Sequence, residues 1–222
     1  MTSHWESTYA ATTAAERSWT EESPSTSLEW IRASGIAKDA RIADIGGGAS
    51  RLVDELVGEG FTRISVVDLS ASALAEAQAR VGGQATFIES DLFAFTPSSL
   101  LGLWHDRAVL HFLSDPSERA AYVDHVAASV EVGGSVVLAC FSLTGPEQCS
   151  QLPVTRASAQ DLVQLFGRRF QLAQSATVDH LTPWGKSQPF TWVRFTRLDE
   201  QPDVSSAQAK GRRQEEVPTP KS

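Results

Sequence analysis

The stretch RIADIGGGAS, from Arg41 to Ser50, constrains the possible folds of this chain more than any other. Residues 42–45 form a short, mainly apolar run typical of a buried strand, and the apolar residues of 52–57 recur at helical spacing. Three glycines stand between them: Gly46, Gly47 and Gly48. Glycines at such a turn accept positive φ angles and let the backbone approach a ligand closely. We therefore predict a strand, a tight turn and a helix whose N-terminal N–H groups face a bound molecule.

An acidic residue at the end of the next strand indicates what that molecule contains. Asp68 follows two valines, about 20 residues after the glycine turn, where an acid accepts hydrogen bonds from ribose hydroxyls. A dinucleotide motif, G-x-G-x-x-G, needs a third glycine where this chain has Arg51. Asp44 would repel a pyrophosphate, and it suits a ligand that carries an ammonium or a sulfonium. The sequence thus predicts a nucleoside-containing cofactor, with a nicotinamide dinucleotide as the less favoured alternative.

Strands and helices alternate along the rest of the chain, which predicts a parallel sheet with right-handed crossovers. The expected strands are 42–45, 63–68, 85–89, 102–107, 134–141, 170–179 and 189–197. The expected helices are 28–34, 50–58, 71–80, 117–130 and 158–166. The last two strands are joined by residues 180–185, a turn by their Pro and Gly, so a hairpin ends the sheet.

The order and spacing of four motifs resemble those of the class I S-adenosylmethionine-dependent methyltransferases. The motifs are DIGGG from Asp44, the single acid Asp68, ESDL from Glu89 and WHDR from Trp104. The resemblance covers roughly residues 19–197 and implies S-adenosyl-L-methionine as the cofactor. It also implies an α/β, Rossmann-like fold with a seven-stranded, mostly parallel sheet, helices on both faces and an antiparallel last strand.

The resemblance also assigns residues to each part of the cofactor. Asp44 and the three glycines would hold the methionine half. Asp68, with the adjacent Leu69, would bind the ribose. Asp91 and Leu92 would contact the adenine. Asp106, at the end of a strand, would fix the methionine ammonium or the acceptor; the alternative for this side chain is an ion pair with the arginine that follows it.

Asp106 and His111 are the catalytic candidates. A histidine titrates near neutral pH, so His111 could take a proton from an incoming nucleophile; the alternative is a structural histidine beside Phe112. The tetrad Asn/Asp-Pro-Pro-Tyr, which marks methyltransferases of planar amide or exocyclic amines, is missing at the position of Asp106. Those acceptors are therefore disfavoured.

Two subgroups of the family resemble this chain about equally. The segment WHDRAVLH, which begins at Trp104, is similar to thiopurine-type S-methyltransferases and to the subgroup that includes the lysine methyltransferase of citrate synthase. The opening HWE, from His4, is similar to the second subgroup. We predict methyl transfer to a thiol or amine of a small molecule, with a protein lysine as the alternative. A non-catalytic cofactor-binding module and a nicotinamide oxidoreductase are alternatives of other classes.

Aromatic residues make the first 27 residues unusual for an exposed end of a chain. Large aromatic side chains gain by burial, so we expect residues 1–27 to form a lid over the cofactor or, alternatively, to cap the core. Residues 28–198 would form the methyltransferase domain, and the polar residues 199–222 a disordered tail. The candidate acceptor contacts are Trp5, Tyr9, Trp19, His180 and Trp184. The four aromatics suit a flat or cationic group, whereas the histidine could instead hydrogen-bond across its own turn.

The amino-acid composition limits the kinds of partner that this chain is expected to bind. The net charge of −8, without a basic cluster outside the tail, disfavours nucleic acid, and no apolar run is long enough to span a membrane. The two cysteines, Cys140 and Cys149, match neither a metal site nor a disulfide framework, and we expect Cys149 to be inert. No leader opens the chain, so we expect a cytoplasmic protein that binds no metal. The oligomeric state stays open.

Overall fold

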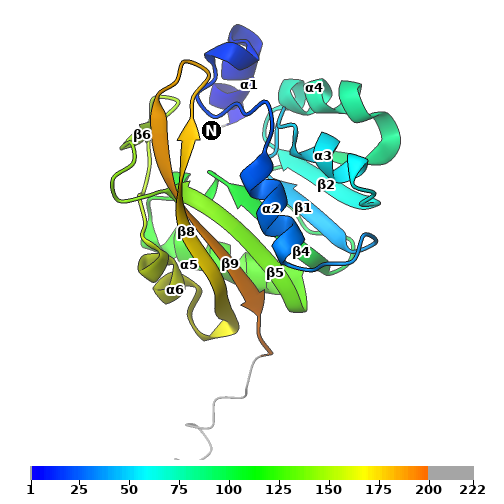
Figure 1. Ribbon diagram of the computed structural model, residues 1–222, viewed down its shortest axis with the longest axis vertical. Helices are drawn as coiled ribbons and strands as arrows, with labels where there is room; N and C mark the ends of the chain where they lie inside the picture. Colours follow the sequence, from blue (N-terminus) through cyan, green and yellow to red (C-terminus); the bar gives the residue numbers. More distant parts are fainter. Residues whose placement is uncertain (1, 200–222) are drawn as a thin grey trace, which may run out of the picture.

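The computed structural model describes residues 2–199. Apart from Asp199, the tail predicted to be disordered lies outside the described residues. One large sheet runs through the described part of the chain, with helices on both faces, and helix α1 (Thr2–Ala11) lies at one end of it (Figure 1). The prediction of a Rossmann-like α/β fold is confirmed.

Seven strands form the sheet in the order β3-β2-β1-β4-β5-β9-β8. Their bounds are β1 Arg41–Ile45, β2 Arg63–Asp68, β3 Thr86–Glu89, β4 Leu101–Arg107, β5 Val130–Phe141, β8 Phe170–Leu181 and β9 Ser187–Arg197. The strands from β3 to β5 pair in parallel, whereas β9 is antiparallel to both β5 and β8. The predicted antiparallel last strand is therefore confirmed. A short hairpin of β6 (Gln148–Cys149) and β7 (Leu152–Pro153) was not expected from the sequence.

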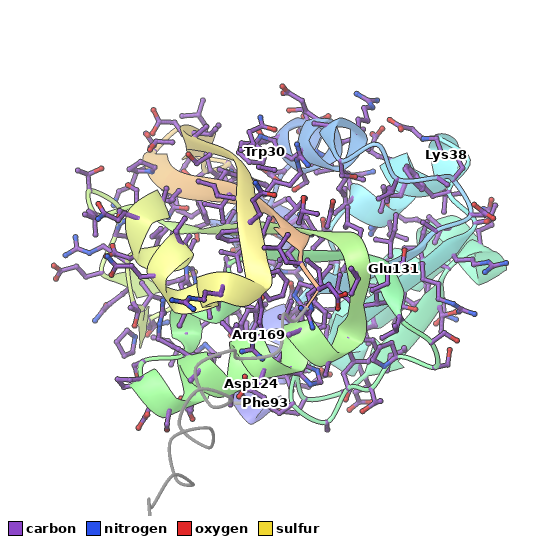
Figure 2. The ribbon with its side chains drawn as sticks, turned by 90° about the horizontal axis from the view of Figure 1, so that it is seen from below. Trp30, Lys38, Phe93, Asp124, Glu131 and Arg169 are labelled. Atoms are coloured by element: carbon purple, nitrogen blue, oxygen red, sulfur yellow. The ribbon has the colours of Figure 1, made fainter. Side chains whose placement is uncertain are left out.

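Helices cover both faces of the sheet. One face carries α2 (Ser25–Ala33), α3 (Leu52–Gly58) and α4 (Ala71–Val81), and the other carries α5 (Pro116–Ser129) and α6 (Ala159–Phe166). Figure 2 shows this division, because Trp30 on α2 and Asp124 on α5 lie on opposite sides of the sheet. Short 3₁₀ helices are η1 (Ala14–Glu16), η2 (Gly82–Gln84), η3 (Leu110–Phe112) and η4 (Gly167–Arg169). None of the helices within residues 2–199 is long and apolar enough to cross a membrane.

Local sequence signals explain where the helices around the site begin. Ser70 precedes α4 and accepts a hydrogen bond from the N–H of Ala73. Asp115 precedes α5 in the same way, and Pro116 occupies the first helical position, where its missing N–H costs nothing. Both helices therefore start directly after the loops that follow β2 and β4.

The side chains of β4 alternate between the two faces of the sheet, and this alternation decides which of them reach the site. Trp104 packs edge-on against Tyr122 of α5, in the core on that face. Leu103 belongs to the core on the opposite face, under α2 and α3. By the same alternation, Asp106 bonds to α5 and His105 bonds to α2.

Candidate functional site

The glycine turn after β1 has no room for side chains at its centre. Gly46 and Gly48 have φ angles of +65° and +46°, and the N–H of Gly46 donates to the carbonyl oxygen of Val67 over 2.7 Å. A Cβ on Gly47 would lie 2.5 Å from Oδ2 of Asp44. The turn therefore places main-chain N–H groups and a buried carboxylate together at the carboxyl end of β1.

A cavity of about 450 Å³ lies at this turn. Its position, at the carboxyl ends of β1, β2 and β4, is where open α/β sheets bind ligands, and its volume suits a small molecule. Most of the predicted cofactor residues line it: Asp44, Gly46, Gly47, Asp68, Leu69, Asp91 and Leu92. Gly48 packs against the N-terminal helix instead, since a Cβ there would lie 2.7 Å from the Tyr9 hydroxyl oxygen.

Asp68 presents a carboxylate to the cavity at the end of β2. Its Oδ1 accepts the N–H of Ser70 over 2.9 Å, and its Oδ2 faces the glycine turn, 3.0 Å from the place of a Cβ on Gly48. Burial raises the pKa of Asp68 to about 6, and the nearby carboxylate of Asp44 contributes to the rise. The site thus holds two neighbouring acids at some electrostatic cost.

Asp91 and Leu92 lie at the other end of the cavity, after β3. Oδ1 of Asp91 accepts the N–H of Phe93 over 2.9 Å, which fixes the carboxylate in an exposed turn. Leu92 is buried beside it and contributes an apolar wall, and the Phe93 ring is partly exposed. A carboxylate next to apolar side chains is suited to a flat heterocycle that carries an amino group.

Two residues that sequence reasoning missed complete the floor of the cavity. The Nδ1 atom of His105 lies 2.7 Å from Oδ1 of Asp44, and its Nε2 atom lies 3.0 Å from the hydroxyl oxygen of Ser27 on α2. Asp44 and His105 are direct partners in the pairing of β1 with β4. The only sequence signal was the alternation of β4, which places His105 on the face opposite its neighbour Asp106.

Asp106 does not line the cavity, so the structure places this candidate elsewhere. The side chain is fully buried, accepts the N–H groups of Val109 and Leu110 over 2.8 and 3.1 Å, and accepts the Tyr122 hydroxyl over 2.6 Å. Burial raises the pKa of Asp106 to about 6. It holds the turn after β4 in shape, and it forms no ion pair with Arg107, which reaches the other face of the sheet.

His111 is also outside the cavity lining. Its ring is fully buried beside Phe112 and Phe141, and neither ring nitrogen has a hydrogen-bond partner among residues 2–199. Burial, with a contribution from the Arg107 cation, lowers the pKa of His111 to about 3. This neutral, enclosed ring matches the structural alternative, and it has no contact with the cavity through which to take a proton.

Arg107 and Glu21 both line the cavity, and the sequence marked neither as a site residue. Nη2 of Arg107 lies 3.4 Å from Oε1 of Glu21, and its Nη1 donates to the carbonyl oxygen of Trp19 over 3.1 Å. Burial opposes ionisation of Glu21, but His180 and Arg107 outweigh it and lower its pKa. The backbone of the next residue, Ala108, is strained at a φ of +76°, as is common where a chain turns sharply at a site.

The N-terminal segment forms an aromatic wall of the cavity. Trp5, Tyr9 and Trp19, three of the candidate acceptor contacts, all line it. Trp5 packs edge-on against Trp19 and Phe112, with ring centroids 5.7 and 5.2 Å apart, and the Trp19 indole N–H donates to the Tyr9 hydroxyl over 3.3 Å. These contacts join α1 to the segment after β4, and the Tyr9 hydroxyl packs against Gly48 of the glycine turn.

Buried polar contacts hold this segment in place. Arg17 donates to both carboxylate oxygens of Glu76 on α4, over 3.1 and 3.0 Å, and to the carbonyl oxygens of Tyr9 and Thr12. The carboxylate of Glu6 accepts the hydroxyl of Ser70 at the start of α4. The segment is therefore anchored to helix α4, which begins shortly after Asp68 at the end of β2.

Two other predicted acceptor contacts lie outside the cavity lining. His180 is buried in the β8–β9 hairpin, and its Nε2 lies 2.6 Å from the carbonyl oxygen of Ser18, so it fastens the N-terminal segment. Trp184, which is 57% exposed, borders a separate open groove beside α1. Cys149 does line the cavity, and burial raises the pKa of its thiol to about 11, which leaves it a weak nucleophile at neutral pH.

The charges around the cavity are unevenly paired. Three of its arginines have carboxylate partners, Arg17 with Glu76, Arg80 with Asp54 and Arg107 with Glu21, and Arg51 also lines the cavity. Within residues 2–199, Asp44 pairs only with His105, and Asp68 has no cationic partner within 4 Å. The described residues contain no cluster of three or more side chains placed to hold a metal ion. The two carboxylates at the glycine turn are thus suited to a cationic organic ligand.

Of the comparisons with known proteins, only the one with solved structures found similar proteins, and it agrees with the fold described above. No protein-family model matches the chain, and no curated protein sequence matches it. Among solved structures, one from work on the conversion of a disulfide bond into a thioacetal group during echinomycin biosynthesis has a TM-score of 0.72 at 16% identity, covering 98% of this chain and 100% of the other.

Two N-methyltransferase structures are also similar. One is NodS from Bradyrhizobium japonicum WM9 in complex with S-adenosyl-L-homocysteine, with a TM-score of 0.67 at 15% identity, covering 89% of this chain and 99% of the other. The second is 1,6-didemethyltoxoflavin-N1-methyltransferase from Burkholderia thailandensis, with a TM-score of 0.67 at 17% identity, covering 89% and 87%. At such identities the likeness establishes the fold, which this chain shares with S-adenosylmethionine-dependent methyltransferases.

Proposed function

We propose that this chain is an S-adenosylmethionine-dependent methyltransferase. The observation that carries the proposal is the pair of carboxylates at the glycine turn, the buried Asp44 and the half-buried Asp68, neither of which has an arginine or lysine partner within residues 2–199. A sulfonium and an ammonium on the same ligand would compensate both acids. The methyltransferase structures with the same fold support this reading.

The residues of the cavity fit the parts of that cofactor in order along the sheet edge. Asp44 and the glycine turn suit the methionine half, Asp68 suits the two ribose hydroxyls, and Asp91 with Leu92 suits the adenine. The bound cofactor would supply a methyl group on a positively charged sulfur. The chain's task is then to hold an acceptor in line with that methyl group and to exclude water, for which orientation alone is worth about 7–11 kcal/mol in favourable cases.

A nicotinamide dinucleotide fits the same cavity less well. Its pyrophosphate would lie at the turn where Oδ2 of Asp44 is 2.5 Å from the place of a Cβ on Gly47. The Asp44 carboxylate and a pyrophosphate at this turn would repel each other, and burial strengthens the repulsion because it lowers the effective dielectric constant. The side chain of Arg51, at the start of α3, also occupies the position of the third glycine of a dinucleotide motif.

We infer that the acceptor is a thiol or an amine of a small molecule. The N-terminal segment encloses the cavity with Trp5, Tyr9 and Trp19, and this wall is anchored by Arg17, which is 4% exposed. An enclosed cavity favours a compact acceptor over a folded protein, whose lysine would have to reach past that segment. A cytoplasmic location is part of the proposal, since both free cysteines are buried and stay reduced most simply there.

Calorimetric titration tests the cofactor class. We expect wild-type protein to bind S-adenosyl-L-methionine and S-adenosyl-L-homocysteine but not NADH, and Asp68→Ala to lose most of that affinity. Gly83→Ala is the matched control, because nothing lies within 4 Å of a Cβ on Gly83. The proposal would be refuted if well-folded wild-type protein bound neither S-adenosyl-L-methionine nor S-adenosyl-L-homocysteine. Binding of NADH alone would indicate a nicotinamide oxidoreductase instead.

The acceptor is tested by turnover. Radiolabelled S-adenosyl-L-methionine would be incubated with thiols, amines and a protein lysate, and label would be followed in the small-molecule and protein fractions. Label in small molecules alone is the expected result. Label on protein lysines would replace our acceptor class by the lysine alternative, and cofactor binding without any transfer would favour a non-catalytic module.

A further inference from the structure

Three buried side chains at the cavity form a chain of hydrogen bonds, and two of the three have no part in the binding roles proposed above. This chain of hydrogen bonds links Ser27 of α2, His105 of β4 and Asp44 of β1, over 3.0 Å from hydroxyl oxygen to Nε2 and 2.7 Å from Nδ1 to Oδ1. The three residues are 1%, 3% and 3% exposed, respectively, yet all of them line the cavity. The three hydrogen-bonded side chains therefore face the cavity and are shielded from bulk water.

The chemistry of the three groups sets the direction of the chain. A carboxylate only accepts hydrogen bonds, so Asp44 fixes the proton of His105 on Nδ1. Nε2 then carries a lone pair and accepts the hydroxyl proton of Ser27. The Ser27 hydroxyl makes no other hydrogen bond within residues 2–199, which leaves its oxygen able to accept a proton from a group in the cavity.

The same order, carboxylate to imidazole to hydroxyl, activates serine in hydrolases, where the imidazole takes the serine proton and the carboxylate orients the ring. Here, the arrangement is rigid because its members come from three packed elements. Asp44 and His105 pair directly across β1 and β4, and Ser27 lies in the first turn of α2. Removing any member would leave the others buried without a partner.

Four other titratable side chains described above are poorly suited to take the acceptor's proton. His111 and Asp106 do not line it. The pKa of Glu21 is lowered because His180 and Arg107 hold its charge, although burial opposes this. Burial raises the pKa of the Cys149 thiol to about 11, so this side chain already carries its proton at neutral pH.

We propose that Ser27, His105 and Asp44 form a proton relay that removes the proton of the methyl acceptor during transfer. The proposal rests on the proposed function and narrows its acceptor to a group that arrives protonated, such as a thiol or an ammonium. The cofactor would supply the methyl group, its carbon–sulfur bond breaking with both electrons going to sulfur. The acceptor's proton passes to the oxygen of Ser27 while the Ser27 proton passes to Nε2 of His105, and Asp44 balances the resulting imidazolium.

Protons are balanced over one turnover of the relay. The acceptor loses one proton and gains one methyl group, and His105 holds the proton until the products leave and water takes it. General base catalysis of this kind contributes about 10²- to 10⁴-fold to a rate. Ser27 would touch the acceptor directly, whereas Asp44 would act by orienting the imidazole in addition to binding the cofactor.

A covalent probe tests the relay without cofactor or acceptor. Diisopropyl fluorophosphate reacts with a serine whose proton can pass to a histidine: a bond forms between the serine oxygen and phosphorus, fluoride leaves, and the proton goes to Nε2. We expect mass spectrometry to locate the label on Ser27 in wild-type protein. His105→Gln should slow this labelling at least 10-fold, and Ser27→Ala should abolish it.

Matched controls separate the relay from general damage to the fold. Ser129→Ala removes another buried helical serine, and His125→Gln removes a histidine of α5; neither residue lines the cavity. Both variants should be labelled on Ser27 at the wild-type rate. Wild-type protein without label on Ser27, or a His105→Gln variant labelled as fast as wild type, would overturn the relay.

Methyl transfer gives the second readout. With the acceptor found by the turnover screen, Ser27→Ala and His105→Gln should lower kcat about 100-fold. Both should bind S-adenosyl-L-homocysteine within about 3-fold of wild type, a difference below 1 kcal/mol. Equal losses of kcat and of cofactor affinity would show that the Ser27–His105–Asp44 hydrogen bonds only stabilise the structure, which would overturn the relay. Failure of wild-type protein to bind the cofactor would instead refute the proposed function, and the labelling result would stand independently of it.

Discussion

Replacing Asp68 by asparagine should weaken cofactor binding and, at the same time, stabilise the empty protein. The asparagine side chain has nearly the same size as aspartate. Its amide oxygen can still accept the hydrogen bond from the Ser70 N–H, which the carboxylate accepts over 2.9 Å. It loses the negative charge that would accept two ribose hydroxyls. Hydrogen bonds to a charged group contribute about 1.5–3 kcal/mol each, so a loss of about 2–4 kcal/mol is expected, or about 30- to 1,000-fold in Kd.

The pH dependence of binding follows from the same side chain. Burial raises the pKa of Asp68 from 3.8 to about 6, so the empty site binds a proton there below pH 6. A ligand that needs the carboxylate competes with that proton, and the affinity of wild-type protein should fall about 10-fold between pH 7 and pH 5. Asp68→Asn has no such proton, so its weaker affinity should vary little over this range.

Stability should change in the opposite sense. The pKa of Asp68 is higher in the folded protein than in the unfolded chain, so the folded state holds the proton more tightly. The free energy of unfolding of the empty protein therefore decreases as the pH rises from 3.8 to about 6, by up to about 3 kcal/mol from this group. Above pH 6, Asp68→Asn should be more stable than wild type by an amount of that order.

Calorimetric titration with S-adenosyl-L-homocysteine at pH 5, 6 and 7, together with urea unfolding of the empty proteins, measures both effects. Asp106, whose pKa burial also raises to about 6, adds a stability slope of the same sign, so the difference between variant and wild type is the quantity to compare. The reasoning would be refuted if Asp68→Asn kept the wild-type pH dependence of binding, or if it were less stable than wild type at pH 7.

Two further substitutions test the walls of the site. Gly47→Ala would place a Cβ 2.5 Å from Oδ2 of Asp44. The forced shift should cost about 1–3 kcal/mol of stability and abolish cofactor binding. Thermal unfolding measures this cost, and Gly83→Ala is the control because its Cβ would meet nothing within 4 Å. Arg17→Met would leave the buried carbonyl oxygen of Tyr9 and the partly buried one of Thr12 without this donor, whereas Glu76, 44% exposed, would be solvated. We therefore expect the N-terminal segment to detach, at a cost of about 1–3 kcal/mol. Tryptophan fluorescence should report that detachment, and an emission spectrum and cofactor Kd equal to those of wild type would show that the anchor is dispensable.

Strand β4 shows where sequence reasoning stopped. The motif WHDR was placed correctly on a strand that ends at the site. Alternation divides its residues between two faces, but both faces of this central strand are buried, so hydropathy did not show which face bears the ligand. Asp106 was chosen and turns toward Tyr122 of α5, while His105, its neighbour, turns toward the cavity.

The N-terminal segment shows a similar division. Its aromatic content predicted burial near the site, and the structure places Trp5, Tyr9 and Trp19 in the cavity wall. Helix α1 itself was not foreseen, because its sequence has no apolar stripe of helical period. Trp184 carried the same aromatic signal and lies in a separate groove, since its hairpin extends past the cavity.

The sequence by itself determined the order of strands and helices, the glycine turn and the acids placed around it. These features depend on local periodicity and on residue types that only a few backbone conformations accept, so they can be identified within a short window. Only the tertiary structure decided that Ser27, His105 and Asp44 meet, and that Glu21 faces Arg107. Those contacts join residues up to 86 positions apart (Glu21 to Arg107) and depend on strand register and on which face a helix covers, which no local pattern encodes.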